Sequence, residues 1–150
     1  MTLDELKQRL HDAGCNPANY QIGEPWIVTD VYCLAKRNGR FHFFYTERGW
    51  DSPPEKIFDD EAEACHFYYD FVMNIRHDHL VGFYQSLDSL QRHASFLENR
   101  GIATSSDKIP YDGWHDPRYR LFVVGRAIFT VRQLLPNLPL NDQTELPDAD

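Results

Sequence analysis

The dipeptide Asn38-Gly39 constrains the fold of this chain more than any other feature. It separates two β-rich segments, residues 27–34 and 40–48. Both of its residues accept a positive φ, which a tight two-residue turn requires, so the pattern predicts an antiparallel hairpin. Alternation along the second strand places three aromatic side chains on one face: Phe41, Phe43 and Tyr45. We expect that face to line the core.

Three helices are predicted from capping residues and apolar spacing. They cover about residues 3–13, 60–75 and 87–100. The first begins with a capping box, in which Thr2 caps and Glu5 follows three residues later. A cluster of acidic residues opens the second helix, and Ser86 opens the third. The apolar stripe of the second helix leaves Tyr68 as an exposed residue.

Residues 119–131 are rich in β-branched and aromatic residues and predict further strand, with Gly125 at a turn or bulge. With 150 residues, of which 42% are hydrophobic, the chain has the size of one domain with a substantial core. We expect one α+β domain over residues 1–135, in which helices cover an antiparallel sheet. Residues 136–150 are acidic and proline-containing, which predicts a flexible tail.

The charge of the chain limits its partners. Twenty-three acidic residues against 15 basic ones give a formal net charge of -8, which repels nucleic acid and anionic lipid and favours a basic partner. The amino-terminal segment lacks the apolar core of a secretion signal, and no stretch approaches the length of a membrane span. We therefore expect a cytoplasmic protein that binds neither nucleic acid nor membrane.

Motifs for catalysis or cofactor binding are weak. The three cysteines form no Cys-x-x-Cys pair, and we find no glycine-rich phosphate loop, so we expect no cofactor and no metal. One alternative is a small metal-dependent or acid/base hydrolase that uses His77, His79 and Glu47. We favour the simpler interpretation, in which residues 77–79 form a solvated helix end and Glu47 belongs to a surface pair with Arg48.

Aromatic residues next to carboxylates are typical of protein interfaces, and a basic partner would complement them. The loop that contains Trp114 has this composition, although the same tryptophan would also suit the core if the loop folded back. The residues that follow Glu47 also combine a tryptophan with a carboxylate. The start of the second helix adds a cluster of carboxylates. The candidate partner-binding residues are Trp50, Asp51, Glu61, Glu63, Tyr111, Asp112, Trp114 and Asp116.

Three segments follow one another in the order VYCLAKRNGRFHFFYTERG, a proline-containing loop and IFDDEAEACHFYYDFV. In this order of segments the chain resembles immunity proteins of bacterial polymorphic toxin systems, of the contact-dependent or Rhs type. The likeness covers about residues 27–75, and YRLFVVGRAIFTV adds to it. The resemblance implies an inhibitor that binds one cognate toxin domain, blocks its active site and catalyses no reaction itself. The resemblance does not identify any binding residue in this chain. A non-catalytic adaptor module with another partner is the remaining alternative.

Overall fold

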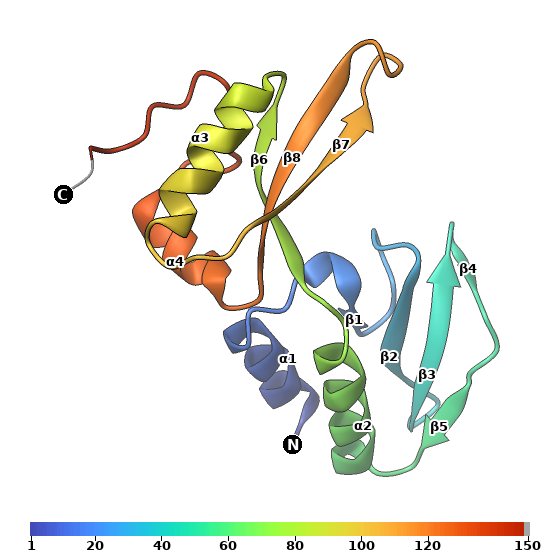
Figure 1. Ribbon diagram of the computed structural model, residues 1–150. Coiled ribbons are helices and arrows are strands. Elements are labelled where there is room, and N and C mark those ends of the chain that lie inside the picture. Colours follow the sequence, from blue (N-terminus) through green and yellow to red (C-terminus); the bar gives the residue numbers. More distant parts are fainter. Residues whose placement is uncertain (149–150) are drawn as a thin grey trace. The chain divides into compact units, whose positions relative to one another are not determined.

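The computed structural model describes residues 1–148 and has an α+β fold, which confirms the expected class (Figure 1). Contacts divide the chain into two compact units, Met1–His77 and the described residues from Asp78 onward. Each unit has its own sheet, so the prediction of one sheet shared by the early hairpin and the late strands is wrong. The expectation of a single domain over residues 1–135 stays a prediction.

The first unit contains two α-helices, a short 3-10 helix and a five-stranded sheet. In chain order these are α1 (Leu3–Asp12), η1 (Pro17–Asn19), β1 (Gln21–Ile22), β2 (Val31–Arg37), β3 (Arg40–Glu47), β4 (Trp50–Asp51), β5 (Lys56–Phe58) and α2 (Glu61–Met73). β1 pairs with β2 in parallel, while β2, β4 and β5 all pair with β3 in antiparallel fashion. The sheet is therefore organised around the central hairpin.

The predicted hairpin is present. Asn38 and Gly39 have φ values of 53° and 76°, and Arg37 pairs with Arg40 directly across the turn. Alternation then sends one set of side chains of β2 and β3 towards α1 and α2, where they form the core. That core contains Leu6, Leu10, Leu34, Phe41, Phe43, Cys65, Tyr68 and Val72.

The helix caps agree with the predictions from the sequence, whereas the burial of one core residue does not. Thr2 Oγ1 accepts a hydrogen bond from the Glu5 amide at 3.2 Å, and the Asp60 side chain accepts one from the Glu63 amide at 3.1 Å. Tyr68, expected to be exposed, is fully buried. Its hydroxyl accepts from the Gln21 amide and donates to main-chain carbonyls, which gives a polar group a satisfied place in the core.

The second unit contains β6 (Asp78–Tyr84), α3 (Leu87–Glu98), β7 (Ser105–Pro110), β8 (Pro117–Val124) and α4 (Ala127–Leu134). The sheet has the order β6-β8-β7 and is antiparallel throughout. Both helices contribute to one core on this sheet. That core includes Val81, Tyr84, Leu90, Leu97, Leu121, Val123, Ile128 and Val131.

Two elements of this unit differ from the sequence predictions. Residues 78–84 form β6, an edge strand of the second sheet, where the sequence predicted no strand. The strand expected to continue to residue 131 ends at Val124, because Gly125 turns the chain with a φ of 60°. The following residues form α4, whose buried Ile128 and Val131 have helical spacing.

Residues 138–146 of the segment expected to be a flexible tail pack on the second unit, and residues 149–150 of that segment lie outside the described residues. Leu140 is 1% exposed, its amide donates to the Val81 carbonyl at 2.8 Å, and its carbonyl accepts from the Phe83 amide at 2.9 Å. Leu146 packs against the same core. A proline-rich and acidic composition therefore did not prevent burial, because the apolar side chains of Leu140 and Leu146 pack in the core of this unit.

His93 of α3 gives the second unit a pH-dependent stability. Its Nδ1 lies 2.8 Å from the Tyr84 hydroxyl, and the side chain is fully buried. Burial lowers the pKa of His93, the charge of Arg92 adds to this, and the Thr144 backbone and Asp142 oppose it. Below pH about 6.5 the unfolded chain therefore binds a proton that the folded chain resists.

We expect the free energy of unfolding to fall as the pH is lowered from 7.5 through 6.5 towards the depressed pKa, because protons then favour the unfolded state. Urea titrations at several pH values measure this slope. In the variant His93→Phe/Tyr84→Phe, which removes both polar partners, part of the slope should disappear. An unchanged slope in this variant would show that other groups cause it.

Candidate functional site

The face of the first sheet opposite α1 and α2 carries the candidate site. Alternation directs Val31, Cys33 and Phe44 to this face, where they form a small buried cluster. Val28, from the segment between β1 and β2, packs against the cluster. The segment of residues 23–30 is thus anchored to the sheet by an apolar contact.

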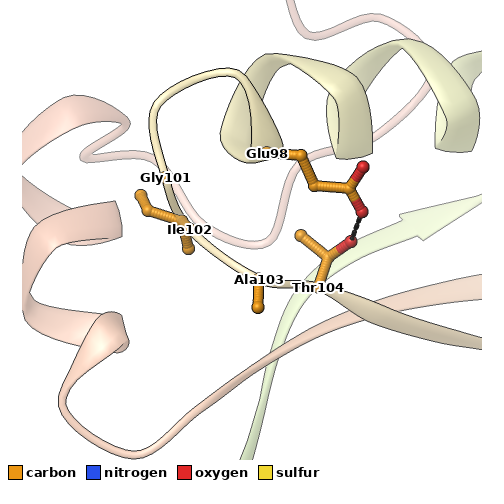
Figure 2. A pocket seen from close by; sticks show the side chains of 5 residues that line it. All are labelled: Glu98, Gly101, Ile102, Ala103 and Thr104. Carbon is orange, nitrogen blue, oxygen red and sulfur yellow. Dashed lines mark hydrogen bonds between the residues drawn. The ribbon is translucent and has the colours of Figure 1, made fainter.

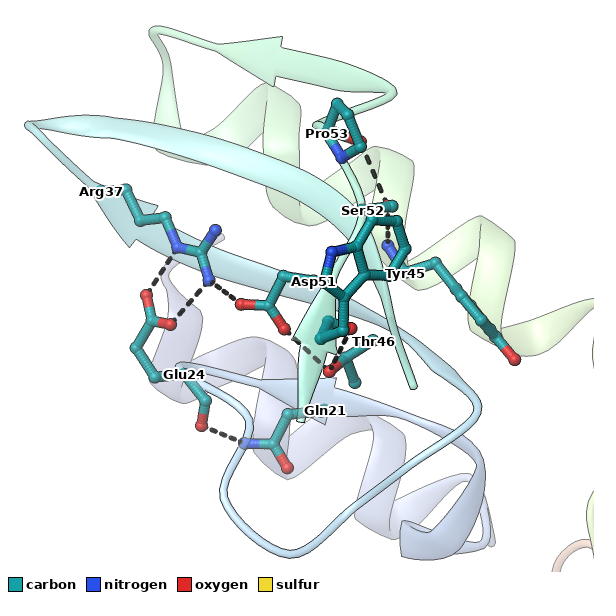
Figure 3. A network of polar contacts seen from close by, with 9 residues as sticks. Gln21, Glu24, Arg37, Tyr45, Thr46, Asp51, Ser52 and Pro53 are labelled. Carbon is teal, nitrogen blue, oxygen red and sulfur yellow. Dashed lines mark hydrogen bonds and ion pairs between the residues drawn. The ribbon is translucent and has the colours of Figure 1, made fainter. Parts of the chain in front are cut away.

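A network of ion pairs fastens this segment further (Figure 3). The Arg37 guanidinium donates from Nε and Nη2 to the two carboxylate oxygens of Glu24, at 2.7 and 2.8 Å, and from Nη2 to Asp51 at 2.9 Å. Asp51 also accepts from the Thr46 hydroxyl at 2.8 Å. The guanidinium carbon lies 3.9 Å from the centre of the Phe44 ring. One arginine therefore connects the segment, β2, β3 and β4.

The network favours the charged forms of Glu24 and Arg37. The hydrogen bonds from Arg37 hold the pKa of the Glu24 carboxyl below its usual range, and those to Glu24 and Asp51 raise the pKa of Arg37. Burial, reinforced by the charge of Asp51, raises the pKa of the Cys33 thiol to about 12. Since the thiolate is the nucleophilic form of cysteine, this raised pKa disfavours reaction of Cys33 at neutral pH.

Above this network the segment presents large apolar side chains to solvent. Trp26 is 91% exposed and Ile27 is 85% exposed. Both line a hollow of about 260 Å³, whose other wall is the β3–β4 hairpin. Arg48 and Gly49 form the turn of that hairpin with φ values of 50° and 77°. We call Trp26, Ile27 and this hollow the Trp26 surface.

Of the two candidate residues in β4, only Asp51 lies at the Trp26 surface. Asp51 lines the hollow, but its carboxylate is engaged by Arg37 and Thr46, so it supports the surface from within. Trp50 is 62% exposed. As the preceding residue of the same strand it points to the opposite face of the sheet. Trp50 and Asp51 are therefore on opposite faces of the sheet, although they are adjacent in the sequence.

The other acidic candidates of the first unit are at the start of α2. Glu61 accepts a hydrogen bond from the Leu3 amide at 3.3 Å and so links α2 to α1. The Glu63 side chain is exposed, and its backbone amide is capped by Asp60. Both acidic residues lie in the first turn, where they complement the helix dipole. Their positions are explained by helix stability.

The remaining four candidates form the tip of the β7–β8 hairpin in the second unit. The Tyr111 amide donates to the Asp116 carbonyl at 3.2 Å. The Arg118 guanidinium stacks on the Tyr111 ring and donates to the Asp116 carboxylate at 2.7 Å. Trp114 is 65% exposed, so it does not fill the core. Asp112 is also exposed. The structure thus distributes the predicted residues over both units.

The histidines of the hydrolase alternative are buried, which corrects the interpretation of a solvated helix end. His77 Nδ1 accepts from the Asn16 amide at 2.9 Å, and Nε2 lies 2.8 Å from the Val72 carbonyl. Both ring nitrogens of His77 are therefore engaged in the structure of the first unit. His79 is buried in β6, whereas Glu47 is exposed at the end of β3.

Neither a metal site nor a second hollow provides a stronger candidate among the described residues. Among residues 1–148 no group of three or more His, Cys, Asp or Glu side chains is placed to hold a metal ion. A hollow of about 400 Å³ follows α3 and is lined by Glu98 and residues 101–104 (Figure 2). There the Thr104 hydroxyl donates to the Glu98 carboxylate at 2.6 Å, so the lining carboxylate already has a partner.

Trp26 and Ile27 were not among the candidate site residues predicted from the sequence, because Ile27 was expected to lie in a strand. β2 begins only at Val31, after Asp30 with a φ of 61°. A signal was present: Gly23 and Pro25 flank Glu24 immediately before the tryptophan, and such residues favour irregular structure. A tryptophan in an irregular segment is a better interface candidate than one in a strand.

Within the described residues, the helices are too short or too polar to cross a lipid bilayer. Comparisons with models of protein families, with curated proteins and with solved structures found no match to this chain.

Proposed function

We propose that this chain is a cytoplasmic immunity protein, which binds a cognate toxin domain and blocks its active site without catalysing a reaction. The observation that carries the proposal is the Trp26 surface. Two large apolar side chains are almost fully exposed on a segment that is held by an arginine network and by the partly buried Val28. Exposed tryptophan on a rigid support is typical of binding hot spots, since little entropy is lost on association.

Charge supports a basic partner. The chain has a net charge of -8, and Asp30, which ends the segment that carries Trp26, is exposed. An acidic surface accelerates association with a basic one and disfavours acidic competitors. Toxin domains that act on nucleic acid are basic as a class, in line with the resemblance described above.

The Trp26 surface predicts the effect of a double substitution. In Trp26→Ala/Ile27→Ala we expect the affinity for the toxin domain to fall about 30-fold, the loss typical of a hot-spot residue. The measurement is calorimetric titration with the toxin-like domain encoded beside the gene, together with survival of cells that express both proteins. Leu87→Ala, which removes a half-exposed leucine of α3, is the matched control and should bind normally.

The outcomes separate the alternatives. Rescue of the cells that depends on Trp26 and Ile27 supports immunity through the Trp26 surface. Rescue that is insensitive to the double substitution but lost in Trp114→Ala/Asp116→Ala would move the contact to the β7–β8 hairpin. Neither rescue nor a complex would remove the immunity proposal, and binding of a different protein would favour the adaptor alternative.

A further inference from the structure

A cleft lined by aromatic side chains lies on the helix-facing side of the first sheet. Tyr32 of β2 and Tyr45 of β3 are direct partners across the hairpin, and Phe71 of α2 contacts the Tyr32 ring. Together with Asp30 these residues line a hollow of about 240 Å³. Tyr32 and Phe71 pack against the core that α1 and α2 cover, whereas the Trp26 surface lies on the opposite face of the sheet. The cleft is therefore a second site.

Ring contacts hold the aromatic walls of the cleft in place. The Tyr32 ring stacks on Phe43 with ring centres 4.9 Å apart, and it meets Phe71 edge-on at 5.2 Å. Its centre lies 5.1 Å from that of Tyr45. Phe43 is buried and also contacts Phe71, at 5.0 Å. A group that enters the cleft therefore meets rings that are already ordered, so little side-chain entropy is lost on binding.

Carboxylates lie next to two of these rings. The Tyr45 hydroxyl donates to Asp30 at 3.3 Å, and the Tyr32 hydroxyl donates to Glu55 at 3.1 Å. Burial raises the pKa of Tyr45, and the charges of Asp30 and Glu47 raise it further. A hydroxyl donor does not neutralise a carboxylate, which can accept several hydrogen bonds. Since the faces of aromatic rings are also negative, the cleft is suited to a cation.

The chain holds its own arginines by the same combination of groups. The Arg37 guanidinium carbon lies 3.9 Å from the centre of the Phe44 ring, and its nitrogens bond the Glu24 carboxylate. Arg118 likewise combines a stacked aromatic ring with a carboxylate. In each case the ring covers the flat face of the guanidinium and the carboxylate orients its edge. The cleft offers these two kinds of partner beside an open hollow.

The size of the cleft limits the choice of occupant. Pockets for small-molecule ligands usually have volumes of about 300 to 1,000 Å³, and this hollow is smaller. A single side chain of a protein fits this space better than a whole small molecule. Among cationic side chains, lysine carries a compact and strongly hydrated charge, whereas the planar guanidinium of arginine stacks on rings and bonds a carboxylate at the same time.

We propose that the cleft formed by Asp30, Tyr32, Tyr45 and Phe71 binds an arginine side chain of a basic partner protein. Asp30 accepts hydrogen bonds from the guanidinium, and the aromatic rings cover its faces. The net charge of -8 favours the approach of such a partner. The proposal concerns a site other than the Trp26 surface and does not depend on the immunity proposal.

The probe is arginine blocked as its N-acetyl methylamide, titrated into the full-length chain and followed by nuclear magnetic resonance. We expect saturable shifts of the ring protons of Tyr32, Tyr45 and Phe71. The blocked citrulline compound, which has the shape of arginine without its charge, should bind at least about tenfold more weakly, because the cation–π contact and the charge-assisted hydrogen bond are both lost. The blocked lysine compound should bind at least about twofold more weakly.

Substitution of Asp30 tests the carboxylate. Asparagine accepts the φ of 61° at this position, so Asp30→Asn should keep the local backbone. We expect it to raise the Kd of the arginine compound about threefold, as for an exposed ion pair. Asp148→Asn, which removes the same charge from an exposed position of the second unit, is the matched control and should bind normally.

Substitution of Tyr45 tests the aromatic wall. Tyr45→Leu removes the ring and should raise the Kd at least about threefold. Tyr45→Phe keeps the ring, so its Kd should stay within about twofold of that of the unaltered chain. Equal affinity of the unaltered chain for the arginine and citrulline compounds would overturn the proposal, and so would the lack of saturable shifts at the lining rings.

Two further results would also overturn the proposal. Equal weakening in Asp30→Asn and Asp148→Asn would attribute binding to the overall charge of the chain instead of the cleft. Tighter binding of the lysine compound would contradict the choice of arginine. The titration uses no toxin domain, so its failure would leave the immunity proposal to its own test.

Discussion

Replacement of Gly82 by alanine is expected to lower the free energy of unfolding of the second unit by about 3 kcal/mol, at the upper end for overpacked cores. A Cβ at this position would lie 2.5 Å from ring atoms Cε2 and Cζ of Tyr84 and still nearer to its hydroxyl. The ring cannot move away easily, because it is fully buried and its hydroxyl is bonded to His93.

Two controls isolate this cause. Gly101→Ala introduces a Cβ at a φ of 80° with no atom within 4 Å, so it should cost only the backbone strain of about 1 kcal/mol. In a Tyr84→Leu background the ring is absent, and Gly82→Ala should then cost much less than in the unaltered chain. Urea unfolding of the four proteins of this cycle gives the coupling energy, and additive effects would contradict the proposed clash.

Tyr68→Phe is expected to destabilise the first unit by about 2 kcal/mol, because it leaves buried main-chain groups without partners. The Tyr68 hydroxyl lies 2.6 Å from the Tyr32 carbonyl and 3.0 Å from the Gln21 amide. It thereby connects α2 with β1 and β2. Phenylalanine keeps the ring packing and removes only the hydroxyl, so the loss reports on these hydrogen bonds.

The matched control is Tyr69→Phe, which removes a hydroxyl from a partly exposed position on the same helix. We expect its effect to stay within about 0.5 kcal/mol, as is usual for surface positions. Urea denaturation measures both variants, and hydrogen exchange of the Gln21 amide should accelerate in Tyr68→Phe alone. Equal stability of the two variants would show that water replaces the lost hydroxyl.

The candidate site was partly accessible from the sequence. The sequence left open whether Trp50 and Trp114 lie in the core or at an interface, and in the structure both side chains are exposed. The same pattern did not show that Asp51 is engaged by Arg37, or that Trp26 is the most exposed of the three tryptophans. These facts depend on which segments pack across the sheet, and local patterns carry no information about that.

The elements that were missed share a physical cause. Residues 127–134 contain β-branched and aromatic side chains, whose propensity favours a strand, yet they form α4 because helical spacing brings Ile128 and Val131 into the core. Residues 78–84 form β6 because they pair with β8, which lies about 40 residues later in the chain. Tertiary burial thus overrode local preference in both cases.

The sequence by itself determined the hairpin at Asn38-Gly39, the starts of the first three α-helices and the α+β class, because turns and caps depend on hydrogen bonds and φ angles within a few residues. Only the tertiary structure decided that the strands form two sheets, that Tyr68 is buried, that residues 138–146 dock on β6 and that Trp26 faces solvent. Those outcomes arise from contacts between residues far apart in the chain, whose energies no local pattern records.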